Sequence, residues 1–127
     1  MVNITVKGKI PSKKNSKQIV CRGRFPMVLP SKAFKAWHDV ALPELVAYRE
    51  KTLMPDPRLP IAQCKVAIIM YAHDARAFDL TNKAESVMDL LVEGGIIEDD
   101  NCNVVNEVVL VFGGIDRVNP RAEITIV

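Results

Sequence analysis

The sequence predicts a single α+β domain over residues 1–127, in which two principal helices pack on a mixed β-sheet. A length of 127 residues suits one hydrophobic core and is too short for two. Strand-like and helix-like hydrophobic periods follow one another in the order strand, hairpin, helix, strand, helix, strand, strand. No repeat, low-complexity tract or interdomain linker divides the chain, so we expect these elements to share one core.

The N-terminal elements are expected to be β-structure. Apolar and polar residues alternate from Val2 to Lys7, which is the period of a strand with one buried face, and this strand should end near Ile10. A polar, basic loop follows it. Two short strands are then predicted at 18–21 and 24–29, with a turn at Arg22-Gly23 that joins them into a hairpin.

A helix is predicted to begin after Ser31, which is a good N-cap residue. Large apolar and small residues recur there at spacings of three or four, at Phe34, Trp37, Ala41 and Leu45. Pro43 interrupts the pattern and is expected to bend or divide the helix, because its ring clashes with the carbonyl four residues earlier. Three prolines between residues 54 and 60 then predict an irregular surface loop.

The second half of the chain alternates strands with a helix. Residues 62–71 have the apolar character of a well-buried strand. The acid-rich segment after Phe78 is predicted to form the second helix, which should end at Gly94-Gly95. Residues 103–112 and 122–127 supply two more strands.

Charge is distributed unevenly along the chain. Residues 1–51 contain eleven Lys and Arg but three Asp and Glu, whereas the remainder contains six basic and twelve acidic residues. The overall charge of +2 therefore combines a cationic part, which suits a polyanion, with an anionic part that would repel one. A bound divalent cation would reconcile the two parts.

Several functional classes are disfavoured by the sequence. No apolar run approaches the roughly 20 residues that span a bilayer, and the N-terminus lacks a secretory pattern, so we expect no membrane partner and a cytoplasmic location. The cysteines are odd in number, widely separated and without a Cys-x-x-Cys pair, which argues against zinc and disulfides. His38 and His73 are isolated, so we expect neither to have a chemical role.

The predicted acidic helix has two distinct faces. On a helical wheel the acids Glu85, Asp89 and Glu93 lie on one narrow side, away from the core. The opposite side is apolar and carries Ala84, Val87, Met88 and Leu91. A solvated helix with an Asn82–Glu85 capping box would explain part of this pattern. Alternatively, the glycine turn folds residues 98–100 back toward the helix, and the converging carboxylates bind Mg²⁺.

The acidic segment resembles a known family, the RusA-type Holliday junction endonucleases of bacteria, their phages and prophages. The resemblance runs from Lys9 nearly to the C-terminus. Its motifs are Pro11-Ser12 followed by Asn15, the helix with Phe34 and Trp37, and above all Asp79-x-x-Asn82, Asp89, Gly95 and Asp99-Asp100. It implies a homodimer that binds four-way DNA junctions in recombination and repair, and that nicks them symmetrically with Mg²⁺ or Mn²⁺ and without an organic cofactor.

Position by position, the resemblance makes Asp79 the first catalytic aspartate, Asn82 the asparagine beside the site, and Asp100 the third aspartate. Two positions depart from the family pattern: Thr81 replaces an aspartate and Glu85 replaces a lysine. Because these two residues are four apart on a helix, the Glu85 carboxylate can reach the space of the missing aspartate. The replacement for the missing lysine stays open between Lys83 and a lysine of the basic loop.

The sequence and the resemblance together predict a metal-dependent nuclease site. The expected catalytic residues are Asp79, Glu85, Asp100 and Lys83. The expected metal ligands are Asp79, Glu85, Asp99 and Asp100, with Thr81, Asn82 and Asp89 in supporting positions. DNA phosphates are expected to contact Lys13, Lys14, Asn15, Lys17, Arg22, Arg24 and Arg76.

Two alternatives remain open beside this prediction. One is a catalytically degenerate dimer that binds branched DNA without cutting it, and the other is a metal-binding or protein-interaction module with no nucleic-acid role. The apolar residues Ile96, Ile97, Val104, Val105 and 108–111 fit either a dimer interface or ordinary core strands.

Overall fold

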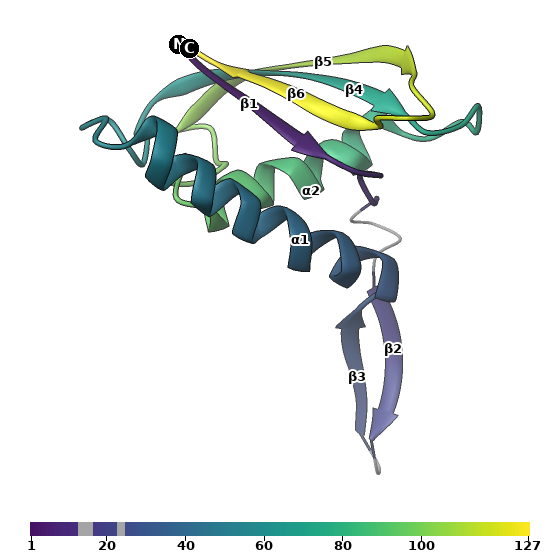
Figure 1. The fold of residues 1–127 in the computed structure, drawn as a ribbon. Helices are drawn as coiled ribbons and strands as arrows, with labels where there is room; N and C mark the ends of the chain where they lie inside the picture. The colour runs from purple at the N-terminus through teal and green to yellow at the C-terminus, as the bar shows by residue number, and fades with distance from the viewer. Residues whose placement is uncertain (13–16, 23–24) are drawn as a thin grey trace.

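The main sheet has four strands in the order β1-β6-β4-β5, and both principal helices cover one of its faces (Figure 1). This computed structural model describes residues 1–12, 17–22 and 25–127, with side chains for residues 1–12 and 31–127. The predicted α+β domain with a mixed sheet and two helices is confirmed. The sheet is mixed because β4 (Cys64–Ala72) is antiparallel to β6 (Arg121–Ile126) and parallel to β5 (Val105–Ile115).

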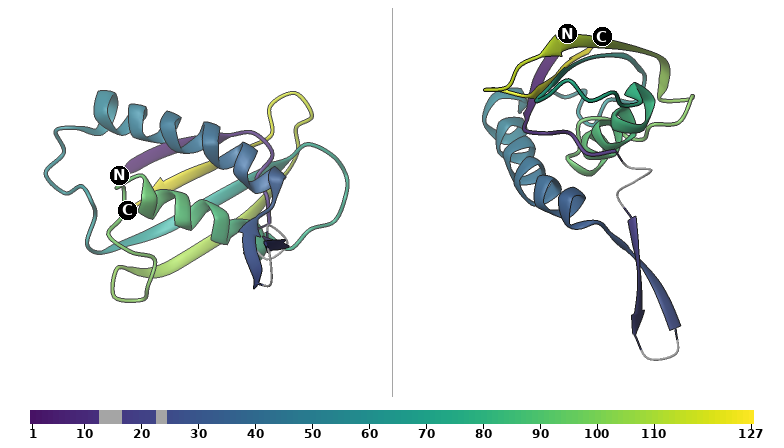
Figure 2. Two further views of the ribbon diagram at one scale, coloured as in Figure 1. Left: turned by 90° about the horizontal axis from the view of Figure 1, so that it is seen from below. Right: turned by 90° about the vertical axis from the view of Figure 1, so that its right-hand side faces the viewer.

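Strands β1, β4 and β6 each bury one face. In β1 (Val2–Lys7) buried and exposed residues alternate strictly, and β4 and β6 repeat the same period. Their inward side chains meet the buried side of α2 (Leu80–Glu93), and the core includes the fully buried Ile68 and Leu91. Since both helices lie on this side, the opposite face of the sheet carries no helix (Figure 2).

Helix α1 (Lys32–Tyr48) begins as the sequence predicts. The Ser31 Oγ accepts a hydrogen bond from the Phe34 backbone N–H at 3.2 Å. The expected division at Pro43 is wrong, because α1 continues to Tyr48 and is followed by the π-helical turn η1 (Arg49–Leu53). Buried residues on both sides of the proline, Trp37 and Ala41 before it and Leu45 after it, pack on the same core and keep the two halves together.

Strands β2 (Lys17–Arg22) and β3 (Phe25–Pro30) form the predicted hairpin as a separate two-stranded sheet. Its register pairs Lys17 with Pro30 and Arg22 with Phe25. The hairpin projects away from the main sheet and the helices (Figures 1 and 2). The second residue of the predicted turn, Gly23, lies outside the described residues. An isolated two-stranded hairpin is marginally stable in water.

Two strand boundaries differ from the sequence-based expectation. Strand β1 ends at Lys7 rather than near Ile10, because Gly8 turns the chain with a φ of 100°. Strand β5 extends beyond residue 112 to Ile115, where it still pairs with Ala72 of β4. Within the described residues, no helix combines the length and the apolar character needed to cross a membrane.

Candidate functional site

The N-terminal end of α2 is organised by Asp79 and Asn82. Asp79 is the N-cap residue, but its side chain makes no capping hydrogen bond. Instead the Asn82 amide Nδ2 donates to the Asp79 carboxylate Oδ2 at 3.1 Å. The proposed Asn82–Glu85 capping box is therefore wrong, because Asn82 lies within the first turn of the helix. The contact holds the exposed Asp79 carboxylate at the start of the helix.

The predicted faces of α2 are confirmed. Its apolar side is buried at Ala84, Val87, Met88 and Leu91. Glu85 and Glu93 are exposed and Asp89 is partly buried, so the carboxylates lie away from the centre of the core. Glu93 also faces α1, where His38 Nε2 lies 2.6 Å from its Oε2. That pair joins the two helices, so the isolated His38 has a structural role that its spacing did not reveal.

Ser86 is a polar residue that the sequence analysis missed. Its side chain is 1% exposed, and its hydroxyl donates to the Pro11 carbonyl oxygen at 2.7 Å. This bond fastens the segment that follows β1 to the middle of α2. The sequence contained one signal for this role, because Ser86 is a hydroxyl residue on the otherwise apolar side of the predicted helix.

The chain turns back at the C-terminal end of α2, as predicted from the two glycines. Gly95 has a φ of 73°, and the backbone N–H groups of Ile96 and Ile97 donate to the Leu91 carbonyl at 3.0 and 3.4 Å. A Cβ atom added at Gly94 would lie 2.6 Å from the Leu45 side chain of α1. A larger residue at position 94 would therefore require Leu45 to move. The turn delivers the loop of Asp99 and Asp100 to the end of the helix.

Two carboxylates act on a third at this end: Asp89 from α2 and Asp99 from the loop both lie close enough to influence Asp100. Partial burial, hydrogen bonding with the Asp99 side chain and the negative charges of Asp89 and Asp99 raise the pKa of Asp100. Asp99 is held in place, since its Oδ1 accepts from the Asp100 backbone N–H at 2.7 Å and its Oδ2 from the Asn101 amide at 3.0 Å. The glycine turn therefore brings Asp100 within electrostatic range of Asp89, but among the described residues the predicted convergence on a metal position is not found. We call Asp89, Asp99 and Asp100 the acidic end of α2.

The predicted metal ligands do not form one group within the chain. Asp79 lies at the start of α2, whereas Asp99 and Asp100 follow its far end, near the supporting residue Asp89, which is ten residues or about 15 Å along the helix axis from Asp79. Glu85 lies between them, exposed on the surface like Thr81. Among the residues that the structure describes, no three His, Cys, Asp or Glu side chains converge on a position that could hold a metal ion.

Lys83 lies beside the N-terminal end of α2 and is partly buried. Its Nζ is 4.0 Å from the centre of the Phe78 ring, a cation–π distance. Burial lowers the pKa of Lys83, while the nearby Asp74 carboxylate opposes that shift. A small crevice brings Lys83 together with Lys9, which had no predicted role, and with His73, which was expected to have none. We call these three residues the cationic crevice, after its two lysines.

Arg76 extends into solvent from the loop that precedes α2. Its side chain is 92% exposed, and its guanidinium Nε is 3.8 Å from Asp74 Oδ2. Asp74 shapes this loop by accepting the Arg76 backbone N–H at 3.1 Å and by pairing with His73 Nε2 at 3.0 Å. The backbone hydrogen bond from Arg76 is the main reason that the pKa of Asp74 is lowered. Arg76 is thus a cation on a structured loop.

The other predicted DNA contacts belong to the loop before the hairpin and to the hairpin itself. Lys13, Lys14, Asn15 and Arg24 lie outside the described residues. Lys17 and Arg22 are the first and last residues of β2, which places them at opposite ends of the projecting strand. The hairpin therefore distributes basic positions along its length.

The apolar segment near β5 divides into core and surface. Ile96, Ile97, Val104 and Val105 are buried, so they are core residues. The rest of β5 forms one edge of the main sheet and exposes a row of large apolar side chains. These are Val108, Val109, Val111, Phe112 and Ile115, each at least 43% exposed. Such a row is suited to contact with another protein surface.

No protein-family model matches this chain, and no curated protein is significantly similar to it in sequence. The function therefore has to be argued from the residues of the site.

Proposed function

We propose that this protein is a Mg²⁺-dependent endonuclease for branched DNA, similar to the RusA-type enzymes, and that it nicks four-way junctions as a homodimer. The observation that carries the proposal is the acidic end of α2, where the loop after the glycine turn places Asp100 close enough to Asp89 and Asp99 for their negative charges to raise its pKa. A divalent cation would relieve this repulsion. The same helix begins beside cations, which suit the phosphates of a nucleic acid.

The acidic end fits a hard cation that keeps most of its water. Mg²⁺ is usually held by one or two protein carboxylates, and water and substrate phosphates complete its shell. Asp99 and Asp100 are exposed and supply such oxygens, and Asp89 lies close enough to influence them. When bound, the ion would activate a water molecule and neutralise charge on the phosphate. Mn²⁺ accepts the same ligands.

The remaining residues have roles in binding and positioning. Lys83 and Lys9, which line the cationic crevice, would offer positive charge to a phosphate beside it. Asn82 fixes the orientation of Asp79 through the 3.1 Å hydrogen bond. Arg76 and the basic positions of the hairpin would contact the DNA backbone on either side of the cut, and these contacts weaken as salt concentration rises.

A homodimer is part of the proposal because symmetric nicking of two strands requires two active sites. The exposed apolar row of β5 is the surface that best suits this contact. Under two-fold symmetry an edge strand can pair with its own copy, and both copies then bury the same side chains. Val111→Lys should convert a dimer to monomers in analytical ultracentrifugation, whereas Val118→Lys, at a 95% exposed loop residue, should not.

A junction-cleavage assay tests the proposal directly. A labelled four-way junction and a linear duplex of the same sequence are incubated with the protein, with and without Mg²⁺, and binding and nicking are scored separately. We expect binding to prefer the junction and paired nicks to need the metal. Junction binding that never gives a product in Mg²⁺ or Mn²⁺ would contradict the nuclease proposal.

One observation favours a second candidate function, a branched-DNA-binding dimer that does not cut. Thr81 stands where the family has an aspartate, and the described carboxylates include no group of three around a metal position. This candidate predicts salt-sensitive junction binding that is the same with and without Mg²⁺. The cleavage assay separates the two candidates without any variant protein.

A further inference from the structure

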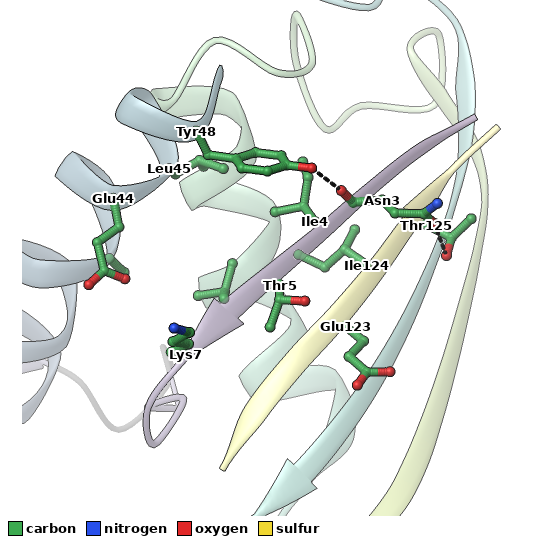
Figure 3. Close-up of a pocket in the computed structure, with 12 residues that line it drawn as sticks. Asn3, Ile4, Thr5, Lys7, Glu44, Leu45, Tyr48, Glu123, Ile124 and Thr125 are labelled. Carbon is green, nitrogen blue, oxygen red and sulfur yellow. Dashed lines mark hydrogen bonds between the residues drawn. The ribbon is translucent and has the colours of Figure 1, made fainter. Parts of the chain in front are cut away.

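Strand β1 forms the edge of the main sheet opposite β5, and a groove runs along it. The groove has a volume of about 530 Å³, and α1 forms its other wall (Figure 3). On the α1 side it is lined by Ala41, Glu44, Leu45 and Tyr48. On the sheet side it is lined by residues 3–7 of β1 and 123–125 of β6.

The backbone of β1 presents hydrogen-bonding groups to this groove. The Tyr48 hydroxyl donates to the Asn3 carbonyl at 3.0 Å, so that carbonyl points away from β6 (Figure 3). The Gly8 N–H donates to Pro120 at 2.9 Å, next to the first residue of β6. In an antiparallel strand both backbone groups of a residue point to the same side, and the side alternates along the chain. The N–H and C=O groups of Thr5 and Lys7 therefore point into the groove.

Only one of these edge positions has a partner in the described part of the chain. Tyr48 satisfies the Asn3 carbonyl, which closes one end of the groove. The outward backbone groups of Thr5 and Lys7 have no hydrogen-bond partner among the described residues. They form a row of donors and acceptors with the spacing that an additional β-strand requires.

The side chains around the groove define the strand that would fit. Ala41 and Leu45 provide an apolar wall, whereas Asn3, Thr5 and Lys7 extend the polar outer face of the sheet. Glu44 and Lys7 lie nearer the end opposite Tyr48 (Figure 3), and neither makes an ion pair with another described residue. A matching segment alternates apolar and polar residues, with a basic residue for Glu44 and an acidic one for Lys7.

We propose that the groove between α1 and β1 binds an extended peptide segment of a partner protein, which adds a strand to the sheet beside β1. Backbone hydrogen bonds would provide affinity, and the α1 wall would select the side chains. A second copy fits poorly, because pairing two β1 edges would bring both α1 helices to the same face and into the same groove. The inference does not depend on the nuclease activity.

Peptides with blocked backbone groups test the proposal in the full-length protein. A panel of seven-residue peptides with alternating Val and polar residues, carrying one Lys and one Glu, is titrated into ¹⁵N-labelled protein. Each peptide is made in two forms, one N-methylated at odd positions and the other at even positions. Because alternate N–H groups of an extended peptide point to opposite edges, each form can donate backbone hydrogen bonds from only one of its two edges. We expect the best peptide to shift the Thr5 and Lys7 amides, and one methylated form to bind about tenfold more weakly than the other.

A matched pair of variants locates the contact. Thr5→Pro removes the N–H that points into the groove and leaves the bonds between β1 and β6 intact, so it should weaken binding about fivefold. Val40→Lys, on an exposed part of α1 outside the groove, should leave binding unchanged. The proposal is overturned if no peptide shifts Thr5 and Lys7, if both methylated forms bind equally, or if these amides shift with protein concentration alone.

Discussion

The two ends of helix α2 carry opposite chemistry. At the N-terminal end Lys83 lies over an aromatic ring in a crevice with Lys9 and His73, and Asn82 holds Asp79. At the C-terminal end Asp99 and Asp100 fold back toward Asp89. About 15 Å of helix separates Asp79 from Asp89. An acid-rich segment that is continuous in sequence therefore has a partly buried lysine near one end and three neighbouring carboxylates near the other.

Each end of α2 contains an ionisable side chain whose charged form is disfavoured by its surroundings. Burial lowers the pKa of Lys83, and burial with like charges raises the pKa of Asp100, so each environment favours the neutral form. Perturbed pKa values of this kind cluster at functional sites, although structural ion-pair networks also produce them. The comparison of the two ends predicts that removing the charge of Lys83 or of Asp100 should impair the proposed nicking of DNA junctions without destabilising the fold.

The largest expected effect is on nicking by substitutions at the acidic end. Asp100→Asn should reduce Mg²⁺-dependent nicking of a four-way junction by at least about 100-fold, because it removes a carboxylate ligand. Junction binding in the absence of Mg²⁺ should stay within about twofold, since Asp100 neutralises no phosphate. Labelled junctions in gel-shift and single-turnover assays measure the two quantities separately. If the Asp100→Asn protein cleaved at the wild-type rate, Asp100 would not belong to the active site.

Asp79→Asn in the same assay tests whether the two ends of α2 act together. A similar loss is expected if one DNA strand contacts both ends in a single site. Mixing the Asp79→Asn and Asp100→Asn proteins then sharpens the comparison. Activity restored in the mixture would mean that each site combines ends from two copies, whereas no restoration would place both ends in one protomer.

An intermediate effect is expected at the cationic crevice. Lys83→Met should slow nicking about tenfold to 100-fold, because the phosphate would lose a positive charge in a partly buried place. Lys51→Met, at an exposed residue far along the chain, is the matched control. Single-turnover rates at saturating protein measure the effect. If the two variants lose activity equally, the crevice contributes only general charge.

A smaller effect is expected on thermal stability at Asp100. Because its pKa is raised in the folded protein, the unfolded chain releases this proton at lower pH. Between the ordinary carboxyl pKa of 3.8 and the higher folded pKa the folded state binds more protons than the unfolded chain. Stability therefore falls as pH rises through this window, and the full penalty is present above the folded pKa. Asp100→Asn should raise the melting temperature of the metal-free protein at pH 7 by about 2 °C, for about 0.5 kcal/mol after solvent screening.

Calorimetry over a pH series measures that change, and Glu98→Gln, in the same exposed loop, is the control. The gain of Asp100→Asn over wild type should disappear below pH 3, where both proteins are neutral at this position. Mg²⁺ should reverse the order of the two proteins, since it stabilises only the form that binds it. A stability loss in the metal-free Asp100→Asn protein would contradict the proposed repulsion.

The smallest expected effect is at Asn82. Asn82→Ala removes the 3.1 Å hydrogen bond to Asp79 at an exposed position, so the free energy of unfolding should fall by about 0.5 kcal/mol. The nicking rate should fall more than stability does if the bond orients Asp79 for the reaction. Urea denaturation and single-turnover rates provide the two values. If the nicking rate and the free energy of unfolding both changed only slightly and to the same extent, the hydrogen bond between Asn82 and Asp79 would have a structural role alone.

Much of the fold followed from periodicity and caps. Ser31 marked the start of α1, the two glycines marked the end of α2, and the buried side of α2 matched the helical wheel. Pro43 misled the prediction, because local proline chemistry argues for a break while burial on both sides of it holds one helix. The end of β1 was also misplaced, since the positive φ of Gly8 depends on the loop that follows.

The sequence by itself determined the alternating strands, the two-sided helices and the separation of a basic part from an acidic part, because these depend on neighbours within a few residues. Only the tertiary structure decided which charges meet. It brought Asp99 and Asp100 to Asp89 through the glycine turn, placed Asp79 at the far end of the helix, and joined Lys83 to Lys9 and His73. Spacing along the chain limits which charged residues can become neighbours. Packing determines which of them do, because elements distant in sequence are brought together around one core.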